Sequence, residues 1–281
     1  MIGLLTDPLM LRALAVAILV GAAAPVVGTF LVQRRLALLG DGIGHVALTG
    51  VALGWLVGSW LGLVQRDALA VPGAVIASVV GAIAIELVRA RGRTSGDLAL
   101  ALLFYGGIAS GALVIKIAGG TNANLVAYLF GSVSTVSTGD VAVTAGLAGI
   151  CLAVGLGLRG ALFAVSNDED MAVASGLPVR ALNVTLAALA ALTVTTAMRV
   201  VGLLLVSALM IVPVAIAQLV ARSFGGTMAL ASVLAVAISV TGLGLTYWYD
   251  LPPGATIVVL AVAVYAVAVA VRPLIARRRA A

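Results

Sequence analysis

Apolar stretches of roughly 18 or more residues recur along almost the whole chain, and no other feature of the sequence limits its fold as strongly. Each stretch is long enough to cross the roughly 30 Å hydrocarbon core of a bilayer as an α-helix. Only 9% of the residues are charged, against about 25% in soluble domains, so the chain cannot cover a water-exposed surface. We therefore predict an all-α integral membrane protein in which residues 1–281 form a single transmembrane domain.

Charged residues and Gly/Pro breaks divide the chain into about nine predicted transmembrane helices, with eight or ten as alternatives. We expect these helices to form a polytopic bundle. Two places leave the count open. The apolar segment Tyr128–Val136 is too short to cross and is a candidate re-entrant segment, and Met198-Arg199 lies where two spans should join. The predicted spans are 10–32, 36–62, 69–88, 98–118, 140–158, 179–197, 203–221, 227–247 and 255–271.

Arginine clusters predict how these spans are oriented. If nine spans alternate, all the clusters fall on one side, and positively charged loops stay in the cytoplasm. The N-terminus is then outside and the C-terminus inside, and the net charge of +6 reports topology, not a nucleic-acid partner. The first run ends in a basic stop signal, which predicts a retained helix and not a cleaved signal peptide. The clusters are Arg34/Arg35, Arg89/Arg91/Arg93, Arg159 with Arg180, Arg222, and Arg272/Arg277/Arg278/Arg279.

The only histidine, His45, follows Asp41 by four residues in the second predicted span. Residues four apart share one face of a helix. An ionisable side chain at membrane depth costs about 2.5–3.5 kcal/mol, so such a pair needs a partner or a wet cavity. Carboxylate and imidazole also suit zinc and manganese. The pattern is compatible with a transient metal site, and equally with Asp41 capping the helix start while His45 bonds a local carbonyl.

A polar segment near residues 167–177 predicts a short cytoplasmic helix. Asn167 or Asp168 is the candidate N-cap, Glu169 and Asp170 favour the first turn, and Gly176 ends the helix. A capped surface helix between two spans is well placed to dock on a partner, although an ordinary loop helix would show the same pattern.

Four glycines in the second span, Gly50, Gly54, Gly58 and Gly62, recur every fourth residue and predict close packing against another helix. The single cysteine, Cys151, cannot form a disulfide or a thiolate site within the chain. No P-loop and no hydrolase or zinc-protease signature is present. We therefore predict a protein that is not an enzyme and that draws its energy from another subunit or an ion gradient.

Four segments resemble the membrane permeases of the zinc/manganese/iron (ABC-3) family of ABC metal-uptake transporters. They are residues 33–53, QRRLALLGDGIGHVALTGVAL, the acidic segment, residues 198–217, MRVVGLLLVSALMIVPVAIA, and residues 249–254, YDLPPG. The resemblance covers nearly the full chain, in order. It departs at Gly42 and Gly44, where relatives often carry larger residues, which predicts a looser helix, and at Arg199, where relatives often carry Lys.

The resemblance implies a type II ABC importer-like permease in the bacterial cytoplasmic (inner) membrane. It implies a second permease subunit, in a homodimer or a pair of related chains, two ATP-binding cassette subunits that hydrolyse ATP, and an extracytoplasmic metal-binding protein. Asp41 and His45 would line the ion path, and Asp168–Gly176 would be the coupling helix gripped by the ATPase. The metal, which could be zinc, manganese or iron, is cargo, so no permanent cofactor is expected.

Two alternatives remain at the sequence level. In one, Asp41 and His45 relay protons in an ion-gradient-driven secondary carrier. In the other, the chain is a type II permease for a metal chelate.

Overall fold

The computed structural model describes residues 7–62, 66–90, 96–119, 126, 128–131, 136–198, 201–249 and 251–280. Within these ranges the regular structure is helical, as predicted. The long helices are α2 (Pro8–Gln33), α3 (Leu39–Trp60), α4 (Ala70–Ala90), α5 (Gly96–Ile117), α7 (Thr138–Gly157), α10 (Val179–Met198), α11 (Leu203–Val220), α12 (Phe224–Tyr249) and α13 (Pro253–Ala280). The short ones are η1 (Arg66–Leu69), α8 (Arg159–Asn167) and α9 (Glu169–Ala174).

Nine helices among the described residues are long and apolar enough to cross a membrane. Their ends lie within three residues of the predicted spans, so the predicted count and type of element are confirmed. Arg199 lies outside the described residues, as do residues 132–135 of the candidate re-entrant segment.

Local capping chemistry explains where two of the spans begin. The Asp7 side chain accepts a hydrogen bond from the backbone N–H of Leu9 (2.9 Å), and Pro8 occupies the first turn, where a missing N–H has no cost. Ser137 and Asp140 form a capping box at the start of α7, in which each side chain accepts from the backbone N–H of the other, at 3.1 and 3.0 Å.

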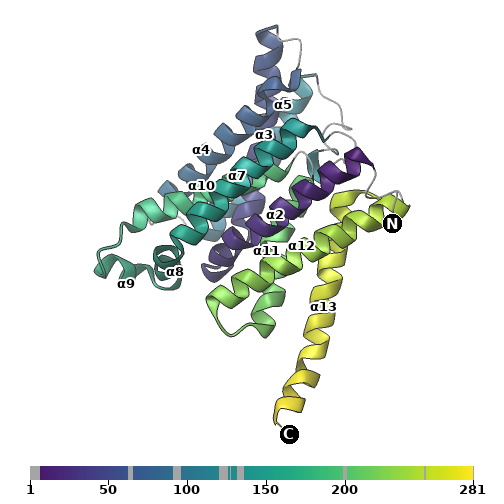
Figure 1. Ribbon diagram of the computed structural model, residues 1–281. Helices are drawn as coiled ribbons and strands as arrows, with labels where there is room; N and C mark the ends of the chain where they lie inside the picture. The colour runs from purple at the N-terminus through teal and green to yellow at the C-terminus, as the bar shows by residue number, and fades with distance from the viewer. Residues whose placement is uncertain are drawn as a thin grey trace.

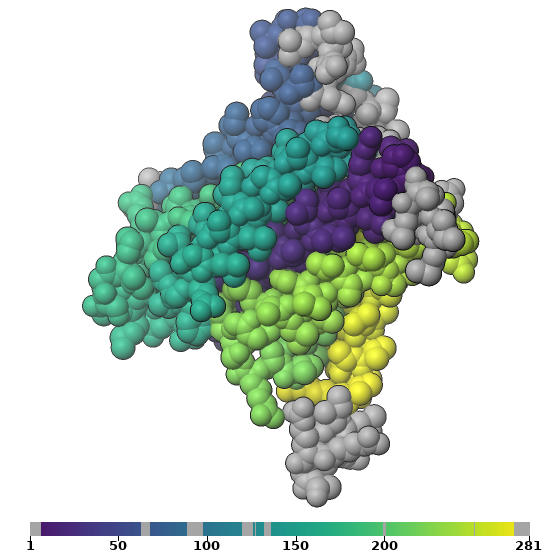
Figure 2. All heavy atoms as spheres, viewed as in Figure 1, coloured from purple at the N-terminus to yellow at the C-terminus, as the bar shows by residue number. Residues whose placement is uncertain are grey.

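The long helices form an inner and an outer group. More than half of the residues in the apolar stretches of α2, α3, α10 and α11 are buried, whereas fewer than half of those in α4, α5, α7, α12 and α13 are. Figure 1 shows α7, α2 and α12 side by side, with α13 at one edge of the bundle. In Figure 2, α8 and α9 lie uncovered at one end of the molecule. The outer surfaces are apolar, as a lipid-facing bundle requires.

Two of the four glycines of the predicted stripe lie at the contact between α3 and α4. A Cβ on Gly50 would collide with the carbonyl oxygen of Gly73 in α4, and one on Gly54 would collide with that of Leu69, the last residue of η1 just before α4. Only glycine lets the backbones approach this closely. Gly58 is also buried. Gly62 is a correction: α3 ends at Trp60, and Gly62 follows it with a φ of +66° and no neighbour within 4 Å of an added Cβ. Gly62 therefore supports the turn after the helix, where a left-handed residue favours glycine.

Candidate functional site

Asp41 and His45 lie on one face of α3, as their spacing predicts. Asp41 Oδ1 is 4.0 Å from His45 Nε2. The Asp41 side chain is 20% exposed, whereas that of His45 is 7% exposed, and His45 Nδ1 has no hydrogen-bond partner among the described residues. A buried ring nitrogen without a partner is costly, which is a reason to look for a ligand at this pair.

The capping interpretation of Asp41 does not fit the structure. The N-cap of α3 is Leu38, whose side chain makes no capping bond, and Asp41 lies inside the first helical turn. Its carboxylate instead faces α11, where the Ser207 hydroxyl donates a hydrogen bond to Asp41 Oδ1 (3.2 Å). The carboxylate is thus oriented by a helix 166 residues further along the chain.

Ser207 was not predicted as a site residue. It lies within the segment at residues 198–217 that carries the family resemblance, and it is a hydroxyl residue in an otherwise apolar run. Those two signals together could have singled it out, but its partner could not be read from the sequence, because the contact depends on how α3 and α11 pack.

A cavity of about 290 Å³ lies against the carboxylate, between α3 and α5. Its lining is apolar and aromatic apart from Asp41. His45 is not part of the lining: the ring of Phe104 packs edge-on against the imidazole, with ring centroids 4.7 Å apart and an interplanar angle of 84°. Asp41 therefore borders the cavity directly, and His45 lies one layer behind it. The lining residues are Leu38, Asp41, Leu100, Ala101, Phe104 and Tyr105.

Close packing holds His45 in this position from two sides. A Cβ on Gly107 of α5 would lie 2.9 Å from the backbone carbon and Cβ of His45, so α5 touches α3 at the histidine itself. On the other side, a Cβ on Gly44 would collide with Leu203 and lie 3.2 Å from Val194. Gly44 therefore serves close packing here, which differs from the looser helix expected from the sequence.

Asp41 and His45 are too few to enclose a metal ion by themselves. Within the ranges that the structure describes, no group of three or more His, Cys, Asp or Glu side chains could hold an ion. Asp41 and His45 offer one carboxylate and one imidazole, which suit zinc, manganese or iron but leave the coordination shell incomplete. Cys151 is buried in α7, and its sulfur lies 3.4 Å from the hydroxyl of Thr193 in α10.

The predicted coupling segment contains the short helix α9, at one end of the bundle (Figure 2). Asp168 is the N-cap of α9 and accepts from the backbone N–H of Met171 (2.9 Å), with Glu169 and Asp170 in the first turn. Asn167 is instead the last residue of α8. Gly176 follows α9 with a φ of +78°, as a helix-terminating glycine does.

The exposed surface of α9 is apolar as well as acidic. Met171 and Val173 are 66% and 60% exposed; both lie inside the predicted coupling helix, although neither was singled out as a contact residue. Exposed apolar residues beside acidic ones on a short helix are typical of a protein-contact surface.

The structure and the sequence match known proteins over most of the chain. The family model described as the ABC 3 transport family matches residues 6–272. The chain is 34% identical to the manganese transport system membrane protein MntC of Halalkalibacterium halodurans, over 92% of this chain and 85% of that protein. It is 31% identical to the chelated iron transport system membrane protein YfeD of Yersinia pestis, over 93% and 84% of the two chains.

A solved structure agrees with these relatives. PsaBC from Streptococcus pneumoniae in complex with Fab superposes with a TM-score of 0.81 at 31% sequence identity, covering 95% of this chain and 92% of the other.

Proposed function

The chain belongs to the ABC 3 transport family, and we propose from this premise that it is the membrane-spanning permease subunit of an ATP-driven importer of divalent metal ions. The observation that carries the proposal is the family match over residues 6–272, which include the nine described helices that are long enough to cross a membrane. The names of relatives add transport of manganese and chelated iron. As a permease subunit it is not itself an enzyme.

Asp41 and His45 are the proposed transient ligands of the ion. They are one carboxylate and one imidazole on a single helix face, beside a cavity, in a membrane-spanning segment. An ionisable pair in that position is a functional site by default. An incomplete shell suits transport, because the ion must bind and then leave.

Phe104 lies beside the pair. Its ring lines the cavity and packs against the His45 imidazole. We assign Phe104 the role of shielding the imidazole from the cavity, so that an ion reaches the pair first at Asp41, whose Oδ1 is 4.0 Å from His45 Nε2.

The partners follow from the family. A second permease subunit would bring a second Asp41 and His45 toward a shared path. Two ATP-binding cassette subunits would grip α9 and hydrolyse ATP, and an extracytoplasmic protein would deliver the metal. The bacterial cytoplasmic membrane is the proposed location, with the N-terminus outside and α9 and the C-terminus inside. The contact between the end of α2 and α9 supports placing both on the same side.

The test is uptake of manganese into proteoliposomes that hold the chain with its ATP-binding cassette partner. His45→Ala is expected to abolish ATP-driven uptake while the ATPase still co-purifies, since His45 is buried and is not part of α9. The control is Lys116→Gln, an exposed residue in the last turn of α5, which is expected to transport at the parental rate. Uptake by His45→Ala at the parental rate would remove the histidine from the mechanism.

Two alternatives give different results in the same vesicles. A secondary carrier would transport metal without the ATPase when only a pH gradient is applied. A chelate permease would transport a metal chelate but not the bare ion.

A further inference from the structure

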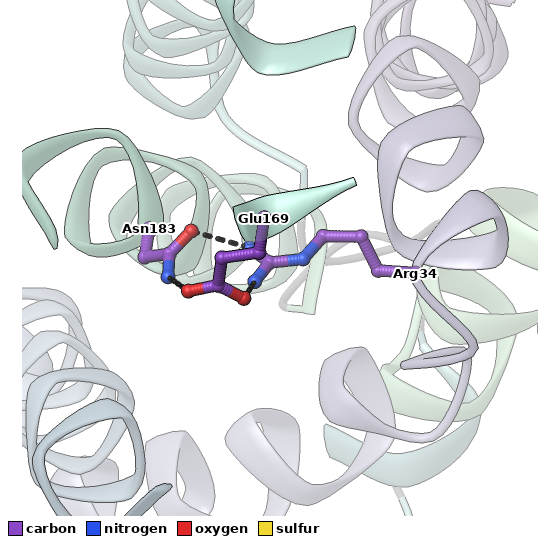
Figure 3. A network of polar contacts seen from close by, with 3 residues as sticks. All are labelled: Arg34, Glu169 and Asn183. Atoms are coloured by element: carbon purple, nitrogen blue, oxygen red, sulfur yellow. Dashed lines mark hydrogen bonds and ion pairs between the residues drawn. The ribbon is translucent and has the colours of Figure 1, made fainter. Parts of the chain in front are cut away.

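Three polar side chains from separate segments form a closed ring at the end of the bundle that carries α9. They are Arg34 at the end of α2, Glu169 in α9 and Asn183 in α10, and Figure 3 shows them meeting. Arg34 Nη1 donates to Asn183 Oδ1 (2.7 Å), Arg34 Nη2 lies 3.2 Å from Glu169 Oε2, and Asn183 Nδ2 donates to Glu169 Oε1 (2.9 Å). Each side chain therefore contacts both of the others.

The burial of the three side chains is unequal. The Arg34 side chain is 6% exposed and Asn183 is 4% exposed, whereas the Glu169 side chain is 48% exposed. A buried guanidinium requires charged or polar acceptors, and Glu169 supplies the charged one. The position of Arg34 is therefore tied to the position of α9, the element that faces the cytoplasmic partner in the proposed function.

Arg34 is also tied to the start of the helix that carries the metal ligands. It is the C-cap of α2, and only a short turn separates it from α3. Within that turn Leu36 donates its backbone N–H to Leu31 (2.8 Å), and Leu39 donates to Leu36 (2.9 Å). Asp41 follows Arg34 by seven residues. A displacement of Arg34 is thus passed to the first turn of α3 through a compact, hydrogen-bonded segment.

We propose that the Arg34–Glu169–Asn183 ring connects α9 mechanically to α3, so that movement of α9 by the ATPase shifts Asp41 and His45. Arg34 and Asn183 are then positioning residues for transport, although neither touches the ion or the ATPase. The inference rests on the proposed function, because it requires an ATPase that moves α9. Coupling of this kind must be shown by variants along the connection, since proximity alone does not establish it.

The experiment measures manganese transported per ATP hydrolysed by the purified complex in proteoliposomes. Arg34→Gln and Asn183→Ala are each expected to lower this ratio by roughly fivefold or more, while the amount of co-purified ATPase is unchanged. Because both side chains are buried, neither can act by altering the docking surface directly. The double variant is expected to be no worse than the poorer single variant, since either change opens the same ring.

Two further variants separate coupling from simple structural damage. Arg34→Lys keeps the charge but has no planar fork to reach both partners, so it should recover only part of the ratio. Arg180→Gln, at an exposed position in the first turn of α10, should keep the parental ratio. A ratio at the parental value in both Arg34→Gln and Asn183→Ala would overturn the inference and leave the proposed function intact. If the parental complex moves none of manganese, zinc and iron when ATP is added, the proposed function fails, and this inference fails with it.

Discussion

Two adjacent glycines of α5 provide a matched test of the packing that positions His45. An added Cβ on Gly107 would lie 2.9 Å from the backbone carbon and Cβ of His45 and from the backbone nitrogen of Val46, whereas a Cβ on Gly106 would meet nothing within 4 Å. Both Gly→Ala changes gain about 0.5–1 kcal/mol of helix propensity, which cancels in the comparison. Overpacking against a backbone costs about 1–3 kcal/mol. Gly107→Ala should therefore be less stable than Gly106→Ala by about 1–3 kcal/mol, or roughly five- to 150-fold in the unfolding equilibrium.

The assay is reversible unfolding of the purified chain in mixed micelles, followed by manganese uptake by the assembled complex. Because α5 must move away from His45 to admit the methyl group, and Thr49 must adjust its 3.0 Å hydrogen bond to the Gly107 carbonyl, Gly107→Ala should also transport more slowly than Gly106→Ala. Equal stability and equal uptake in the two variants would refute the claim that α5 holds the histidine by direct contact.

Three further predictions follow from the site and the topology. Ser207→Ala removes the hydroxyl that donates to Asp41 (3.2 Å) and should lower manganese uptake about tenfold, whereas Ser207→Thr should retain most of the uptake. Parental uptake by the alanine variant would show that the serine does not orient the carboxylate. Phe104→Ala should raise the rate at which diethyl pyrocarbonate modifies His45, the only histidine of the chain, and an unchanged rate would show that the ring does not cover the imidazole. Met171 is 66% exposed. In a Cys151→Ser background, Met171→Cys should react with a membrane-impermeant maleimide only from the cytoplasmic side. Labelling from the outside would contradict the proposed orientation.

The membrane-spanning helices could be predicted closely because a bilayer fixes their length. Each span needs an apolar run that matches the hydrocarbon core, and charged or Gly/Pro breaks mark the ends, so the span over 179–197 matches α10 at Val179–Met198. The predicted stripe of glycines extended one glycine too far, to Gly62. Spacing shows which residues would share a helix face, but it does not show that α3 ends at Trp60.

The pairing of Asp41 with His45 is a local feature, so its spacing was sufficient to place both on one face. The rest of the site is not local. Ser207 reaches Asp41 across 166 residues, and Arg34 reaches Glu169 across 135. Such contacts depend on which helices become neighbours, and amphipathic spacing carries no information on that in a chain that is apolar on nearly all sides.

The most direct test of the metal path is X-ray absorption spectroscopy of the purified full-length chain loaded with zinc. The account predicts a shell of nitrogen and oxygen ligands at about 2.0–2.2 Å, with an imidazole signal that disappears in His45→Gln, because His45 is the only histidine present. A spectrum without imidazole, or one that His45→Gln leaves unchanged, would contradict the assignment of Asp41 and His45 as the ligands of the transported ion.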